Sequence, residues 1–175
     1  AGERRAAYRF SGYWKDVGTI DSLWDANMDM LAVDSGVQLF DPTWPIYART
    51  PTKPPHFMGS KAVVSHSMVT GGCEVYGEVE NSVLFHSVRV EEGAQVKYSI
   101  LMPGAVVKAG AVVEYAIVAE NAVIGEGARV GAPPEDDKPE EWGIAVVAEG
   151  IKVGDGARIP AKSMVTRNVK SGGVR

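Results

Sequence analysis

The sequence is poor in the residues that mark several common protein classes. It contains one cysteine, so no disulfide bond can form within the chain. No apolar run approaches the ~18 residues that span a bilayer, and the first residues lack the apolar stretch of a secretory signal. Lys and Arg total 18 against 22 Asp and Glu, and the net charge of −4 argues against a nucleic-acid binder. We therefore expect a protein of a reducing, cytoplasmic compartment with no nucleic-acid or membrane partner.

Histidine is equally scarce, and the three residues His56, His66 and His86 are scattered. No two of them stand at i, i+4 and no C-x-x-C pair exists, which excludes the usual zinc-ligand spacings. A histidine could still act as a catalytic base, as an acyltransferase would need, but surface positions for His66 and His86 are the favoured interpretation.

Leucine is rare while valine is abundant. The chain has 5 Leu and 8 Ile against 25 Val, and 20 of the Val lie between Val63 and Val165. A helical bundle would build its core from good helix formers such as Leu, whereas β-branched residues favour strands. The C-terminal two-thirds of the chain is therefore predicted to be β-structure.

A repeat of 17 residues organises this region, because segments 82–98, 99–115 and 116–132 stack almost in register. Aliphatic residues recur at spacings of six, six and five. This inward lattice has sixteen positions, of which twelve are Val: Val63, Val69, Val75, Leu84, Val90, Val96, Leu101, Val107, Val113, Val118, Ile124, Val130, Val147, Val153, Ile159 and Val165. Each block therefore contains three straight segments.

A second lattice of mostly small residues stands two residues before the first, and side chains two apart share one face of a strand. Cys73 belongs to it, which favours a core position over a reactive thiol. One small and one aliphatic inward residue per segment describe a prism with three flat faces. The pattern predicts a parallel β-solenoid of about five coils, mainly β in class, in which each coil buries its aliphatic side chains against its neighbours.

The lattice is interrupted twice. Between Val75 and Leu84 the spacing is nine where five is expected, which predicts a short bulge at residues 76–81. Between Val130 and Val147 the surplus residues read APPEDDKPEEWG, and so proline-rich and acidic a segment cannot join a ladder. We expect it to form a surface loop between coils.

Ahead of the solenoid, residues 34–60 hold five prolines interleaved with aromatic residues and are predicted to form a packed, extended connector. Residues 1–33 include a helix carrying Leu23, Trp24, Met28 and Leu31, capped around Asp21 and Ser22, with Ser22 and Asp25 as a weak capping box. Three aromatic residues precede the helix: Tyr8, Phe10 and Trp14. So little chain surrounds them that we expect them to pack on something outside this chain.

Asp16-Val17-Gly18-Thr19 is the only compact polar motif outside the solenoid. The glycine permits a tight turn, the threonine can cap a helix, and the aspartate is a turn residue or a metal ligand. Spacing alone favours the turn.

Two stretches carry a resemblance to a known family. Residues 8–20, which include Trp14-Lys15-Asp16-Val17-Gly18-Thr19, resemble the end of the catalytic domain of glucose-1-phosphate adenylyltransferases. The phrases Val83-Leu84-Phe85, Met102-Pro103-Gly104-Ala105 and Ala116-Ile117-Val118 resemble the β-helix of that family. Residues 124–129 and 153–158 resemble hexapeptide repeats, whose fold is the left-handed β-helix.

This resemblance implies sugar nucleotidyl transfer, in which ATP and glucose 1-phosphate give ADP-glucose and pyrophosphate with Mg²⁺. Asp16 would be a metal ligand in the full-length enzyme only, because the family's nucleotide loop, second metal-binding Asp and sugar-phosphate Lys have no counterpart here. The chain is thus expected to be a C-terminal portion, inactive alone, with no catalytic residue and no bound cofactor. Its divisions would be an α/β remnant of the nucleotidyltransferase domain (1–33), the connector (34–60) and the β-helix (61–170).

The resemblance also implies that the β-helix assembles subunits, as a homo-tetramer, and takes part in binding a sugar-phosphate effector. Glu149 stands where many plant relatives place an effector-binding Lys, so that contact is not carried over. Candidate effector contacts are instead Arg158, Arg167 and Lys170, although a solvated basic face is the simpler interpretation. Two alternatives remain: a hexapeptide-repeat acyltransferase, and a non-catalytic regulatory subunit of the same pyrophosphorylase.

Overall fold

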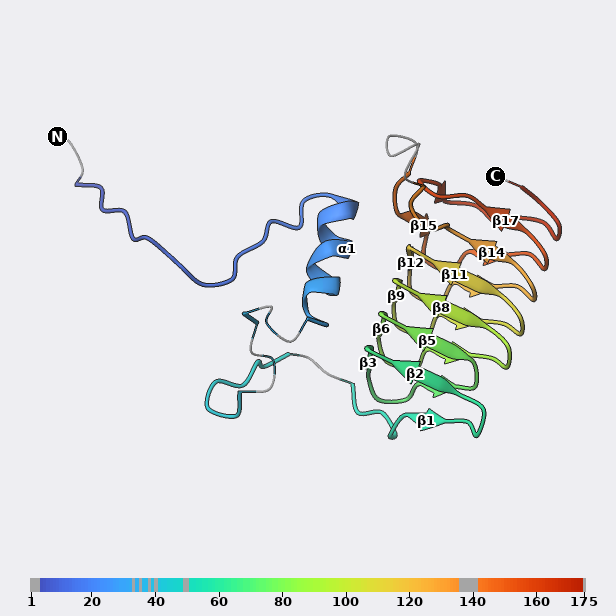
Figure 1. The fold of residues 1–175 in the computed structure, drawn as a ribbon, viewed down its shortest axis with the longest axis horizontal. Helices are drawn as coiled ribbons and strands as arrows, with labels where there is room; N and C mark the ends of the chain where they lie inside the picture. Colours follow the sequence, from blue (N-terminus) through green and yellow to red (C-terminus); the bar gives the residue numbers. More distant parts are fainter. Residues whose placement is uncertain are drawn as a thin grey trace.

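A computed structural model describes residues 4–32, 34, 36–37, 39, 41–48, 51–135 and 142–174. Apart from one short helix, the regular structure in these residues is a parallel β-solenoid (Figure 1). The helix, α1 (Ile20–Asp29), lies beside one face of the solenoid. Within the described ranges, no helix has the length and apolar character needed to cross a membrane.

Three six-stranded sheets form the faces of the prism, and every pairing is parallel, with each strand bound to the strand three further along the chain. Sheet A contains β1 (Phe57–Met58), β4 (Glu74–Val75), β7 (Arg89–Val90), β10 (Val106–Val107), β13 (Val123–Ile124) and β16 (Lys152–Val153). Sheet B contains β2 (Val63–Ser65), β5 (Glu78–Glu80), β8 (Gln95–Lys97), β11 (Val112–Glu114), β14 (Arg129–Val130) and β17 (Arg158–Ile159). Sheet C contains β3 (Met68–Val69), β6 (Val83–Leu84), β9 (Ile100–Leu101), β12 (Ala116–Val118), β15 (Ala145–Val147) and β18 (Met164–Val165).

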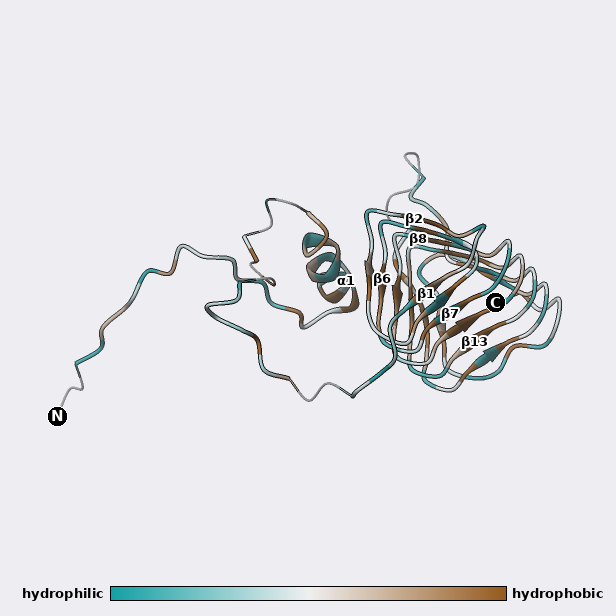
Figure 2. Ribbon diagram, turned by 90° about the horizontal axis from the view of Figure 1, so that it is seen from below, coloured by the Kyte–Doolittle hydropathy of each residue, from teal (hydrophilic) through white to brown (hydrophobic). Residues whose placement is uncertain are grey.

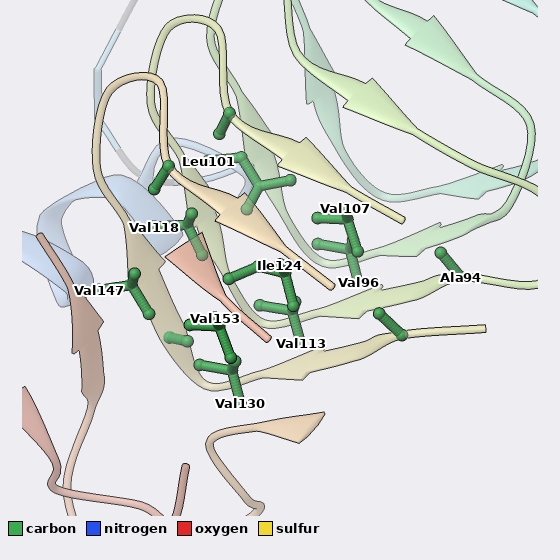
Figure 3. Packing of buried hydrophobic residues seen from close by; sticks show 14 of the residues in the cluster. Ala94, Val96, Leu101, Val107, Val113, Val118, Ile124, Val130, Val147 and Val153 are labelled. Atoms are coloured by element: carbon green, nitrogen blue, oxygen red, sulfur yellow. The ribbon is translucent and has the colours of Figure 1, made fainter. Parts of the chain in front are cut away.

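The inward lattice predicted from the sequence is confirmed along most of its length. Register pairs join lattice residue to lattice residue, as in Leu84 with Leu101 and Val107 with Ile124. From Val75 onward every lattice side chain is at most 2% exposed, and the chain coils so that they stack inside the prism (Figure 3). Figure 2 shows the same division, with apolar strands around a core and polar corners.

The predicted bulge at residues 76–81 is wrong. This interval contains the whole strand β5, whose Val79 is fully buried and pairs with Val96. The corner before it is short because Gly77 lies so close to the next coil that a Cβ there would overlap the carbonyl oxygen of Ala94. The corner between β4 and β5 is therefore two residues shorter than the other corners between sheets A and B, and the strand after it is still present.

The first lattice position also needs correction. Val64 pairs with Val79, so Val64 takes the inward register and Val63, which is 59% exposed, points outward. The spacing from Val64 to Val69 is then five, which is the regular spacing between the inward residues of sheets B and C, as from Val96 to Leu101. The small residue two positions earlier is then Ala62, which packs against the core, and not Lys61.

Six strands per sheet give the solenoid one layer more than the five coils expected. The additional layer begins at β1, which pairs with β4 although it falls within residues 34–60. Connector residues 41–48 and 51–56 have no regular strands or helices, but they are not packed as predicted, since Trp44 and Tyr47 are 83% and 92% exposed. Phe40 lies outside the described residues.

The acidic insertion lies between β14 and β15, as expected for a loop. Its described parts, residues 131–135 and 142–144, form no strand, while residues 136–141 lie outside the described ranges. Because β15 still pairs with β12 and β18, the coils close around the insertion without loss of register.

Candidate functional site

The Asp16 motif forms a turn that leads directly into α1. The Asp16 Oδ1 atom accepts a hydrogen bond from the Gly18 backbone N–H at 3.1 Å. Thr19 is the N-cap and forms a capping box with Ser22, each side chain bonding the backbone N–H of the other. The helix therefore begins at Ile20 and is capped by Thr19, not by the predicted Asp21 or Ser22, because Thr19 already supplies the acceptor. The predicted capping box of Ser22 and Asp25 is wrong, since the box is Thr19 and Ser22. The helix ends before Leu31.

Asp16 is exposed, and the described part of the chain holds no group of three His, Cys, Asp or Glu side chains that could bind a metal. The turn interpretation of this residue is supported by its geometry, since the carboxylate is already engaged by the backbone. A metal role for Asp16 therefore requires a second carboxylate from outside these residues.

Lys15 and Tyr13 tie the turn to the far end of α1. The Lys15 ammonium lies 2.7 Å from Asp29 and 3.7 Å from Asp25, and the Tyr13 hydroxyl donates to Asp29 at 3.0 Å. The hydrogen bond from Lys15 lowers the pKa of the Asp29 carboxyl and raises the pKa of Lys15 itself. Desolvation, helped by the bond to Asp29, raises the pKa of Tyr13.

An aromatic cluster joins α1 to the solenoid. The Trp24 Nε1–H donates to the Tyr98 carbonyl at 2.7 Å, and the Trp24 ring lies 5.9 Å from the Tyr115 ring. Tyr115 stacks on Tyr98 at 4.8 Å and meets Trp142 edge-on at 5.5 Å. The cluster binds residues more than seventy positions apart in the sequence, so α1 is fixed to sheet C and is not a loose tail.

Beneath this cluster, the outer face of sheet C is apolar. Ile100, Ile117 and Ile144 are 1%, 4% and 6% exposed and pack with Leu23, Trp24 and Met28. The expected partner outside this chain concerns the aromatic residues of the segment before the helix, and it stays a prediction. There, Tyr8, Phe10 and Trp14 are 91%, 62% and 77% exposed.

A small cleft opens where the start of α1 meets the last coils. Its volume is about 270 Å³, and it is lined by Ile20 and Asp21 from the helix, by Trp142 of the insertion, and by Lys162, Ser163 and Met164 at the start of β18. A second hollow of about 480 Å³ lies at the corner of sheets C and A, between Lys53, Phe85, His86 and Pro103. Each combines apolar walls with a basic side chain.

The basic residues predicted to meet an effector are all exposed on the last coil. Arg158 lies in β17 on sheet B, whereas Arg167 and Lys170 follow β18 on either side of Val169. Val169 bridges to Val153 of sheet A, so Arg158 and the other two residues lie on different faces.

Cys73 is fully buried, and its Sγ–H donates to the Phe85 carbonyl at 3.0 Å, which confirms the core interpretation. Burial raises the pKa of the thiol, as expected for an unreactive cysteine. His66 is exposed beside Asn81 Oδ1, and His86 is half-buried at the rim of the second hollow.

Comparison with known families settles what kind of solenoid this is. Residues 53–154 match the family model described as "GlmU-like, C-terminal hexapeptide". The chain belongs to this hexapeptide family. Its repeats support the left-handed β-helix expected from the sequence, and residues 1–33 match a second model, described as "Nucleotidyl transferase".

Curated relatives of this hexapeptide protein are named glucose-1-phosphate adenylyltransferase. One from Clostridium perfringens is 50% identical over 103 residues, and one from Bacillus mycoides is 49% identical over 104 residues. These alignments cover 59% of the chain but only 26% and 28% of the relatives. The chain therefore matches about a quarter of the length of these enzymes.

Among solved structures, the hexapeptide protein is similar to a perosamine N-acetyltransferase from Caulobacter crescentus, with a TM-score of 0.46 and 17% sequence identity. The match covers 70% of this chain and 53% of that one.

Sequence reasoning missed the partners of Trp24. Tyr98 and Tyr115 end two successive 17-residue blocks and both adopt positive φ angles of 47° and 48°. A bulky aromatic residue repeated at a left-handed corner, where small or polar residues are usual, was the available signal. The Lys15 to Asp29 pair had no comparable signal, because it spans a turn whose direction the sequence does not specify.

Proposed function

We propose that this chain is the C-terminal part of a glucose-1-phosphate adenylyltransferase, in which the β-helix assembles subunits and takes part in allosteric regulation. The observation that carries the proposal is 50% identity over 103 residues to enzymes of that name. The match of residues 1–33 to a nucleotidyltransferase model also supports it, because this segment stands before the hexapeptide match, in the order that the proposal requires.

In the proposed reaction, a phosphate oxygen of glucose 1-phosphate attacks the α-phosphorus of ATP. The bond to the bridging oxygen between the α- and β-phosphorus atoms breaks, pyrophosphate leaves, and ADP-glucose forms. Mg²⁺, when bound, would neutralise the phosphate charges, and in the complete enzyme Asp16 would supply one carboxylate ligand to it. The turn suits this role, since one Asp16 oxygen is held by Gly18 N–H and the side chain stays exposed.

The chain alone is proposed to be inactive, because one exposed carboxylate does not form a nucleotide site. The remaining roles follow the same proposal: a cytoplasmic homo-tetramer assembled through the β-helix, with Arg158, Arg167 and Lys170 near a sugar-phosphate effector.

A chimera tests this proposal directly. The C-terminal part of the Clostridium perfringens relative is replaced by the corresponding residues of this chain, starting at residue 1, and ADP-glucose formation is measured with saturating ATP, glucose 1-phosphate and Mg²⁺. We expect activity within tenfold of the parent, and none from this chain alone. A chimera that is folded, by circular dichroism and gel filtration, yet inactive would refute the proposal.

The role of Asp16 is tested in the same chimera. Asp16→Asn is expected to lower kcat at least a hundredfold and to raise the Mg²⁺ concentration needed for half-maximal rate. Asp21→Asn is the matched control, because Asp21 is also an exposed aspartate at the start of α1. Equal effects of the two substitutions would remove the metal role.

A further inference from the structure

The segment before α1 has two different sides. Tyr13 and Lys15 are half-buried, whereas Trp14 and Asp16 are exposed. Neighbouring side chains of an extended chain point to opposite sides, and this segment runs beside α1 without helix or turn (Figure 1). Tyr13 and Lys15 therefore face α1, and Trp14 and Asp16 face away from it.

Asp29 holds the side that faces the helix. Its Oδ2 atom accepts hydrogen bonds from the Lys15 ammonium at 2.7 Å and from the Tyr13 hydroxyl at 3.0 Å. We call Tyr13, Lys15 and Asp29 the clamp. Because Asp29 is the last residue of α1, the clamp fixes the segment at the far end of the helix, while the capping box of Thr19 fixes it at the near end.

The carboxyl-terminal half of α1 is acidic, which is not what a helix by itself favours. The helix dipole is negative at this end, so carboxylates there are destabilising. The last turn contains no basic residue, although Asp29 ends the helix and Asp25 stands one turn earlier. Lys15 supplies the missing positive charge from outside the helix, at 2.7 Å from Asp29 and 3.7 Å from Asp25. The acidic end of α1 is therefore matched to Lys15.

The side that faces away presents the Asp16 carboxylate in one orientation. Its Oδ1 atom accepts the Gly18 N–H at 3.1 Å, so the side chain cannot rotate without breaking that bond. Its Oδ2 atom has no hydrogen-bond partner among the described residues. Since Trp24 anchors α1 to the solenoid, the clamp also fixes Asp16 relative to the coils.

We propose that the clamp positions the Asp16 carboxylate for metal binding. This inference rests on the proposed nucleotidyltransferase function, and it makes Tyr13, Lys15 and Asp29 positioning residues, because each acts through Asp16. Without the clamp, residues 13–18 would lose their attachment to the end of α1. Asp16 would then have to be ordered each time an ion binds, which weakens binding.

¹⁵N relaxation of the chain alone, without metal, measures the effect of the clamp on Asp16. Backbone order parameters of about 0.85 are expected for residues 16–18, as in α1. In Lys15→Met and in Asp29→Ala they should fall below about 0.6, while α1 stays ordered. Lys15→Arg keeps the positive charge and the N–H donors, so its values should stay near those of the wild type. Unchanged order parameters in Lys15→Met would overturn the inference.

Asp21→Ala is the matched control for Asp29→Ala. Asp21 is an exposed aspartate in the first turn of α1, where its charge suits the helix dipole. Its loss should weaken the helix more than loss of the Asp29 carboxylate does, yet leave residues 16–18 ordered. If Asp21→Ala loosens these residues as much as Asp29→Ala does, helix stability orders the turn and the clamp does not.

The chimera connects the clamp to the metal. Lys15→Met should raise the Mg²⁺ concentration for half-maximal rate at least fivefold, while KM for glucose 1-phosphate stays within twofold. A merely structural loss would lower the amount of active enzyme without changing its Mg²⁺ dependence. An active chimera whose Mg²⁺ dependence is unchanged by Lys15→Met refutes this inference alone. A folded but inactive chimera without substitutions refutes the proposed function, and this inference with it.

Discussion

Replacing Trp24 with alanine should release α1 from the solenoid while the coils stay folded. Trp24 is the one side chain of α1 that both donates a hydrogen bond to the solenoid and contacts its aromatic cluster in the described structure. A helix of ten residues is marginal in water on its own, so a released α1 should also unfold.

The magnitude follows from the contacts that are lost. The hydrogen bond to the Tyr98 carbonyl contributes about 1 kcal/mol net. The ring contact with Tyr115 contributes about 1 kcal/mol, and the apolar area that half-buried Trp24 covers adds roughly another 1 kcal/mol. A total of about 3 kcal/mol corresponds to a change of roughly a hundredfold in the docking equilibrium.

Hydrogen exchange measures that equilibrium residue by residue. In Trp24→Ala the amides of α1 should exchange about a hundredfold faster, while those of β10 to β13 keep their protection. Trp24→Phe keeps the ring contact and loses only the hydrogen bond, so its effect should be about fivefold. Trp14→Ala, a control at a 77% exposed tryptophan, should change neither. Unchanged exchange in α1 of Trp24→Ala, or equal acceleration in α1 and the coils, would refute the reasoning.

Three further predictions concern the coils and the Asp16 turn. Ile124→Asp should destabilise the solenoid by at least about 4 kcal/mol in urea unfolding, because it buries an unpaired charge, whereas Val123→Asp on the outer face should cost far less. Gly77→Ala should lower stability by about 2 kcal/mol, since its Cβ overlaps backbone of the next coil; a melt equal to wild type would contradict the corner geometry. Because Lys15 lowers the pKa of Asp29 in the folded state, their contact stabilises the turn above the ordinary aspartate range and is lost as pH falls through the folded pKa. A carboxyl titration by NMR should show that pKa rising in Lys15→Met, and no rise would show that Lys15 is not its cause.

The repeat was predictable because every coil buries the same face, and burial dictates residue type at each inward position. What spacing could not supply was the number of residues that each corner uses. Val79 was missed because the glycine corner before it is two residues shorter than the other corners between sheets A and B. Val63 was misplaced because a spacing of six was assigned before Val69, where the regular spacing of five leads to Val64. The number of residues between two aliphatic positions is the sum of the strand and corner lengths between them. When a corner is short, this number can be too small to suggest the strand that it contains.

The candidate site was less predictable, because its contacts depend on three-dimensional arrangement and not on local pattern. Every residue has a backbone carbonyl that can accept a hydrogen bond from a tryptophan, whatever its side chain. Tyr98 could therefore not be paired with Trp24 from the sequence. The helix itself was predicted, but the surface on which it packs was not. That surface is the outer face of sheet C.

The outward isoleucines of sheet C explain why this face differs from the other two. Ile100 and Ile117 pair in register between inward neighbours, yet both are as inaccessible as the core. A solenoid needs no apolar residue on its outside, and the corresponding outward positions of sheets A and B include Arg89 and Gln95. Leu23, Trp24 and Met28 of α1 cover the isoleucines together with Met102, Tyr115 and Trp142. α1 therefore contributes to the stability of the solenoid, although its sequence matches a nucleotidyltransferase model. Separating α1 from the coils at the connector would expose part of an apolar face to water.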